Sequence, residues 1–238
     1  MRTMILLVAM LGTAAGAAAP AGFAAVAAAG RVVEMRAPLW MNGAVTLGAD
    51  TRGTVSRKSL GDTRSAGLQD VVLSDVRRHG GMRFALTGPA AGGDLAGECG
   101  FDRSETQVAR KSLQLSVPAE ALVMDCRFTR NGADAGVLLL DGAPASGKLV
   151  QPAARVGEIR TPGATLMVRS VHHLAGTRLP TDTPVGYEFL ADGKVVGALD
   201  LTRAKGRPIA LPADAAQADA VTLAAVALGL FWDPGDTD

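Results

Sequence analysis

The residues of this chain that could carry chemistry are few, and the histidines come first. His172 and His173 are adjacent. On a β-strand, neighbouring side chains point to opposite faces, so we do not expect the two rings to share a metal ion or to act as a direct pair. His79 precedes two glycines and is typical of a turn. An envelope hydrolase in which His172 or His173 works with a distant Ser or Asp stays an alternative, because catalytic triads need not be visible in sequence.

A second candidate for chemistry is Gly142–Lys148, which matches the first seven positions of a phosphate-binding loop. The match ends at Leu149, where such a loop needs a Ser or Thr hydroxyl for magnesium, and Pro152 interrupts the helix that should follow. We interpret the segment as an exposed hairpin loop. The sequence therefore predicts no cofactor, no metal site and no identifiable catalytic residue.

Positive charges gather in Thr51–Ser65, which we interpret as a loop-rich region. The four cations are Arg52, Arg57, Lys58 and Arg64, with Asp50 and Asp62 nearby. An anion or lipid-headgroup patch is one interpretation, and a solvated face of mixed charge is the interpretation we favour.

The two cysteines lie in matching surroundings. Glu98–Ser104 and Asp125–Asn131 share the order acid, Cys, any residue, Phe, any residue, Arg, polar residue. On two neighbouring strands in matched register, Cys99 and Cys126 would lie close enough to join. We predict a disulfide, with two free buried thiols as the alternative.

The first residues have the character of an export signal. Arg2 precedes a short apolar run, and the chain is then rich in Ala and Gly up to Gly30. Residues 1–29 are predicted to be a signal peptide cleaved before Gly30, after the small residues Ala27-Ala28-Ala29. Ala17-Ala18-Ala19 also fits, but Pro20 would follow that cut. An uncleaved anchoring helix is the alternative, and the predicted location is the periplasm or the extracellular medium.

The composition of the chain bears on which classes of partner it can bind. The chain of 238 residues has a formal net charge of +1, and aromatic residues make up 4% of it. A nearly neutral chain has no strong field for nucleic acid, and few aromatic rings are available to stack on bases. We therefore predict no nucleic-acid partner.

Short segments of strand character follow one another from Arg31 to Leu211, bounded by Gly, Pro, Asp and Asn turns. Gly186–Leu199 is the clearest hairpin, because two alternating strands flank the turn dipeptide Asp192-Gly193. No long helix separates the segments, so we predict a single mostly β domain over residues 30–238, an antiparallel barrel or sandwich. The segments with the clearest breaks between them are Gly53–Arg57, Val71–Val76, Met82–Thr87, Leu95–Phe101, Leu113–Val117 and Leu122–Thr129.

One helix is predicted, over residues 213–232. Its core from Ala220 to Trp232 is apolar on every side, which indicates a helix buried in protein or lipid. The apolar part is shorter than the roughly 20 residues needed to cross a bilayer, so we favour burial in protein over a membrane tail anchor. We therefore predict no transmembrane span after signal cleavage. The residues expected to be buried are Val221, Leu223, Val226, Leu228, Leu230 and Phe231.

Val185–Leu201 and Ala220–Asp233 together carry a resemblance. Many antiparallel strands followed by an apolar C-terminal helix ending in aromatic and acidic residues resemble the tubby C-terminal, LURP-one-related and phospholipid-scramblase superfamily. The resemblance implies a closed barrel wrapped around the helix. Relatives act at membranes in the cytosol through basic clusters or lipidated cysteines, which this sequence does not match, so the lipid-related role does not follow from the resemblance.

The functional expectation is an exported, non-enzymatic β-barrel. It would bind a hydrophobic ligand, a lipid or an envelope partner. The envelope hydrolase and a purely structural role are the alternatives.

Overall fold

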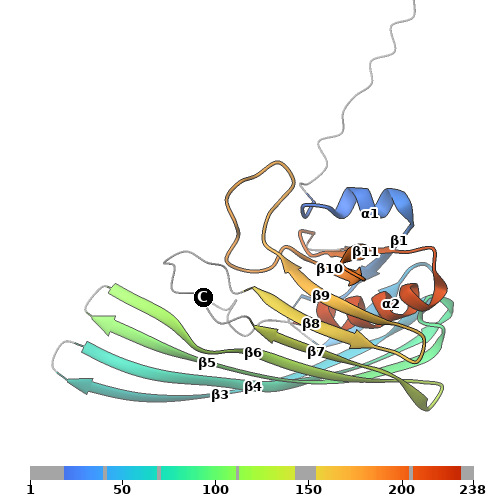
Figure 1. The fold of residues 1–238 in the computed structure, drawn as a ribbon. Helices are drawn as coiled ribbons and strands as arrows, with labels where there is room; N and C mark the ends of the chain where they lie inside the picture. Colours follow the sequence, from blue (N-terminus) through green and yellow to red (C-terminus); the bar gives the residue numbers. More distant parts are fainter. Residues whose placement is uncertain are drawn as a thin grey trace, which may run out of the picture.

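The computed structural model describes residues 19–39, 42–68, 71–110, 113–142, 154–203 and 206–231. Within these ranges, twelve antiparallel strands close into one barrel with a C-terminal helix, α2 (Ala215–Leu230), which confirms the predicted fold class (Figure 1). The strands are β1 (Arg31–Arg36), β2 (Gly43–Leu47), β3 (Thr51–Leu68), β4 (Val71–Gly88), β5 (Gly93–Arg110), β6 (Leu113–Arg130), β7 (Ala133–Gly142), β8 (Arg155–Arg160), β9 (Thr165–Val171), β10 (Gly186–Ala191), β11 (Lys194–Asp200) and β12 (Arg207–Leu211).

The barrel is a meander that closes on itself. Each strand pairs with the next one along the chain, and β12 returns to pair with β1, so that Arg31 lies opposite Leu211. Asn131 and Asp192 are the non-glycine residues with positive φ among the described ones, and each precedes a glycine in a two-residue hairpin turn. The turn at Asp192-Gly193 was predicted from its dipeptide, and Asn131-Gly132 is a dipeptide of the same kind.

Helix α2 supplies the centre of the core. Asp214 caps its first turn, because the carboxylate accepts a hydrogen bond from the Gln217 backbone N–H at 2.8 Å. From Ala220 to Leu230 every residue is buried, and Phe231 just beyond the helix is partly buried. The helix therefore takes the space that a barrel of this size would otherwise leave open.

Side chains from nearly every strand pack around this helix. Gly197 on β11 allows one close approach, since a Cβ there would lie 2.6 Å from Val221 Cγ2. The largest fully buried side chains of the strands are Met35, Leu47, Leu86, Leu95, Met124, Phe128, Leu138, Leu140, Ile159, Leu166, Tyr187 and Phe189.

Four strands are much longer than the sequence predicted. Strands β3, β4, β5 and β6 have 18 residues each and extend together beyond the barrel as a four-stranded sheet (Figure 1). The predicted breaks at Gly80-Gly81 and Pro118, and the loop-rich reading of Thr51–Ser65, were wrong. Continuous pairing with neighbouring strands satisfies the backbone through these residues. Pro118 pairs with β5 alone, and an edge strand tolerates proline.

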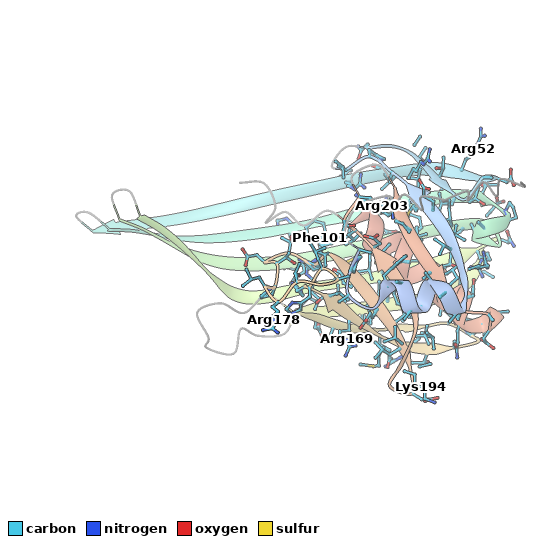
Figure 2. The ribbon with its side chains drawn as sticks, turned by 90° about the horizontal axis from the view of Figure 1, so that it is seen from above. Arg52, Phe101, Arg169, Arg178, Lys194 and Arg203 are labelled. Atoms are coloured by element: carbon cyan, nitrogen blue, oxygen red, sulfur yellow. A yellow bond between two sulfur atoms is a disulfide. The ribbon has the colours of Figure 1, made fainter. Side chains whose placement is uncertain are left out.

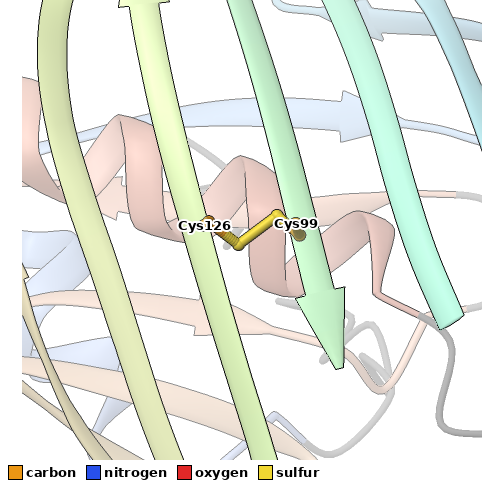
Figure 3. Close-up of a disulfide and its surroundings, with 2 residues drawn as sticks. All are labelled: Cys99 and Cys126. Carbon is orange, nitrogen blue, oxygen red and sulfur yellow. A yellow bond between two sulfur atoms is a disulfide. The ribbon is translucent and has the colours of Figure 1, made fainter. Parts of the chain in front are cut away.

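The predicted disulfide is present. Cys99 on β5 and Cys126 on β6 lie directly opposite each other, with a Cα–Cα distance of 4.0 Å (Figure 3). Both cysteines are buried on the inner side of the barrel. The repeated pattern around the two cysteines therefore marked their matched register.

Residues before β1 also have structure. Helix α1 (Phe23–Ala29) lies on the outside of the barrel, although the sequence places it in the export leader (Figure 1). Neither helix of the described ranges has the length and apolar character needed to cross a bilayer.

Candidate functional site at the barrel mouth and on the projecting sheet

Two arginines from the barrel wall bind the end of α2. Arg57 Nε donates to the Leu230 carbonyl at 2.9 Å, and the guanidinium of Arg207 donates to the Gly229 carbonyl. A helix leaves its last carbonyls without partners and carries partial negative charge there. The last turn of α2 has no basic residue of its own, so the barrel supplies the cations. Arg57 was expected on a solvated face and instead caps the helix.

These two guanidiniums lie close together in a desolvated place. Burial, together with the smaller effect of the positive charge of Arg207, lowers the pKa of Arg57 to about 10. Burial likewise lowers the pKa of Arg207. Arg57 remains a cation at neutral pH because its pKa still lies well above 7.

A third arginine extends this cluster. Arg155 at the start of β8 is buried, and its Nη1 donates to the Tyr187 hydroxyl at 3.0 Å. Its guanidinium lies over the Phe231 ring, 5.8 Å from the centroid, while Phe101 meets the same ring edge-on at 5.4 Å. Figure 2 shows Phe101 at the end of the barrel from which the long strands project. The cluster therefore closes the barrel mouth around the end of α2.

Next to Arg155 lies a serine–histidine pair. Ser170 Oγ is 3.0 Å from His172 Nε2, and His172 Nδ1 is 2.9 Å from the Thr181 carbonyl oxygen. Because a carbonyl only accepts, Nδ1 carries the proton and donates to Thr181, which leaves Nε2 to accept from the serine hydroxyl. Ser170 Oγ also accepts the Arg155 backbone N–H at 2.8 Å.

The environment keeps His172 neutral. Its pKa is lowered chiefly by burial and also by the charges of Arg155 and His173, against smaller raising effects from the Thr181 carbonyl and Asp182. The exposed fraction of His172 is 6%, whereas His173 is exposed. The two rings thus lie in different environments, as expected for neighbours on opposite faces.

The pair combines two roles. A hydroxyl bonded to a neutral imidazole, itself oriented by a carbonyl, is the arrangement of an activated nucleophile and its base. The same bonds also fasten the segment between β9 and β10, since Thr181 donates both its N–H and its hydroxyl to the His172 carbonyl. Sequence alternation placed Ser170 and His172 on one face, so the pair could have been found before the structure.

The projecting sheet forms a second candidate site. Its register places residues of all four strands in rows, and rows two residues apart share one face. In the two rows nearest the tips, seven of the eight residues are apolar: Ala66, Leu73, Val108 and Leu115, then Leu68, Val71, Arg110 and Leu113. Of the alternating rows, the first is polar throughout (Ser65, Ser74, Gln107 and Ser116), and the second holds Gly67, Val72, Ala109 and Gln114. The sequence pattern in this register is therefore more apolar in one set of alternate rows than in the other.

The remaining residues singled out in the sequence do not form one site. His79 lies within β4 rather than in a turn, beside a hollow of about 510 Å³ that Lys58 and Arg83 also line. Arg83 pairs with Glu98 there, at 2.6 Å. Gly142 ends β7, and the rest of Gly142–Lys148 falls outside the described residues, as does the side chain of Arg64. Among described residues, no cluster of three or more His, Cys, Asp and Glu could hold a metal ion.

In comparisons with known proteins, no family model, curated protein or solved structure matches the chain.

Proposed function

We propose that this protein is an exported, non-enzymatic barrel that binds the lipid of an envelope membrane through the tips of β3–β6. The observation that carries the proposal is the pair of rows near the tips with seven apolar residues of eight, set against alternate rows with five polar residues of eight. The interior of the barrel holds α2, so an apolar ligand binds outside it. The closed barrel around an apolar helix also agrees with the resemblance to the tubby and scramblase superfamily.

The size of the patch favours lipid over a protein partner. Four strands spaced about 4.8 Å apart, and two rows that each take up two residues at about 3.3 Å per residue, cover roughly 250 Å² of the sheet. Stable protein interfaces bury about 800 Å² on each partner. Roughly 250 Å² of apolar surface transferred into lipid is worth about 6 kcal/mol, which suits reversible binding at a membrane surface.

The test is flotation with vesicles of phosphatidylethanolamine and phosphatidylglycerol. The purified wild-type protein is expected to float with the vesicles, and the double variant Leu73→Asp/Leu115→Asp is expected to stay in solution. The matched control is Ser74→Asp/Ser116→Asp, which adds the same charges one residue along each strand, in an alternate row. The proposal fails if the wild type does not float, or if both double variants float equally.

Protein capture is a separate outcome of the same variants. If the wild type stays in solution with vesicles but binds an envelope protein through Leu73 and Leu115, the sheet serves a protein partner and the lipid proposal is wrong. Thermal unfolding of each variant shows whether the barrel is intact, because the tips lie far from α2 (Figure 1).

The second candidate is an envelope hydrolase, and the observation that favours it is the Ser170–His172–Thr181 chain of hydrogen bonds. In this mechanism Ser170 Oγ attacks an ester carbonyl while His172 Nε2 takes its proton. Ser170→Ala and His172→Gln should each abolish hydrolysis of a p-nitrophenyl ester, and His173→Ala is the control. If the wild type hydrolyses none of a series of esters with different acyl lengths, the hydrolase hypothesis is wrong. Ser170 and His172 then only hold the segment between β9 and β10 in place.

A further inference from the structure

The segment before β1 is built into the outer surface of the barrel. Helix α1 lies against β11, β12 and β1. Phe23 is 8% exposed and packs with Ala198 of β11 and Ala210 of β12, while Val26 and Ala27 of the helix pack against the same cluster. Alanine on a barrel's outer side is buried here because the helix covers it.

Backbone hydrogen bonds hold the residues that precede the helix. The Ala175 N–H donates to the Ala19 carbonyl at 2.8 Å, and the Ala21 N–H donates to the His173 carbonyl at 2.9 Å. Pro20 lies between them and forms a bridge with Leu174. Residues 19–21 thus add a short antiparallel pairing to the segment after β9.

Two glycines lie where this segment meets the barrel, Gly186 on β10 and Gly30 at the end of the segment itself. A Cβ at Gly186 would lie 2.8 Å from Pro20 Cγ, and a Cβ at Gly30 would lie 2.0 Å from the Leu211 carbonyl oxygen. Contacts closer than about 3 Å require one partner to move. A Cβ at Gly186 would lie closer still, 2.4 Å, to the Leu199 carbonyl oxygen, so strand pairing alone already requires glycine there. The barrel positions covered by residues 19–30 are therefore Ala198 on β11 and Ala210 on β12.

From these contacts we propose that the export leader is removed before Ala19, so that α1 stays in the mature protein. The inference rests on the export part of the proposed function. Gly16-Ala17-Ala18 provides the small residues a signal peptidase needs, closer to the apolar run Ile5–Leu11 than Ala27-Ala28-Ala29. Water hydrolyses the Ala18–Ala19 peptide bond, which leaves a carboxylate on Ala18 and a new amino terminus on Ala19.

Cleavage before Gly30 would have a structural cost that this site avoids. It would remove Phe23 from Ala198 and Ala210 and leave that apolar surface uncovered. It would also remove the backbone partners of His173 and Ala175. A cut before Ala19 keeps all of these contacts and still leaves Pro20 out of the first position after the cleaved bond.

The experiment is N-terminal sequencing and intact-mass measurement of the full chain expressed in a Gram-negative host and recovered from its periplasm. A first residue of Ala19 is the expected result, and a first residue of Gly30 would overturn the inference. A full-length chain found in the cytosol would instead overturn export itself, so the two failures are distinguishable. Ala18→Phe should block this cleavage, whereas Ala29→Phe, at an exposed position, should leave the mature terminus unchanged. The reverse pattern would place the cut before Gly30.

Discussion

Replacing Leu228 tests whether α2 organises the fold. Leu228 is 1% exposed, near the C-terminal end of the helix inside the barrel. Truncating such a side chain to alanine costs about 2–5 kcal/mol, because apolar contacts are lost and a cavity remains. Aspartate at the same place adds the burial of an unpaired carboxylate, a further cost of several kcal/mol. The total is comparable with the whole stability of a typical domain, about 5–15 kcal/mol.

The assay is urea unfolding followed by far-UV circular dichroism, with the disulfide intact. Leu228→Ala should unfold cooperatively at a lower urea concentration than the wild type, and Leu228→Asp should show no cooperative transition. The control is Leu179→Asp, because Leu179 is 82% exposed and its replacement should leave the midpoint unchanged. A Leu228→Asp variant that is soluble and melts like the wild type would refute the central role of the helix.

Two further predictions concern the disulfide and the buried histidine. Replacing both Cys99 and Cys126 with alanine should lower the free energy of unfolding by about 3–4 kcal/mol, because the bond closes a loop of sequence separation 27 in the unfolded chain. Urea unfolding midpoints measured without reductant test this prediction, and an unchanged midpoint would contradict it. The lowered pKa of His172 means that the unfolded chain takes up a proton first as pH falls below about 6.5, so stability decreases there. His172→Gln should reduce the loss of stability between pH 7.5 and pH 5.5, and an unchanged pH dependence would show that other groups cause it.

Some of the structure could be predicted because local pattern and tertiary structure agree. The helix around Leu228 is apolar on every side, and such a helix has to be surrounded by other apolar groups. The repeated residues around Cys99 and Cys126 carried the register of β5 and β6 directly. The turns at Asn131 and Asp192 follow from the backbone conformation that those dipeptides favour.

Other parts could not be predicted because their cause is not local. Gly80, Gly81 and Pro118 are breaking signals in isolation, and only pairing with neighbouring strands keeps them extended. The capping of α2 by Arg57 and Arg207 joins residues far apart in the chain. Composition alone could not separate α1 from the residues before it, because both are rich in alanine.

Barrel closure by β1 and β12 has a consequence for the timing of folding. Strand β1 can pair with β2 early, but its second partner, β12, is made only after almost the whole chain, and α2, which fills the interior, comes later still. Contacts of such long sequence separation make folding slow, since loop-closure entropy is lost before the contacts form. The chain consequently lacks its complete core until α2 has been synthesised, so the closed barrel forms only after synthesis ends.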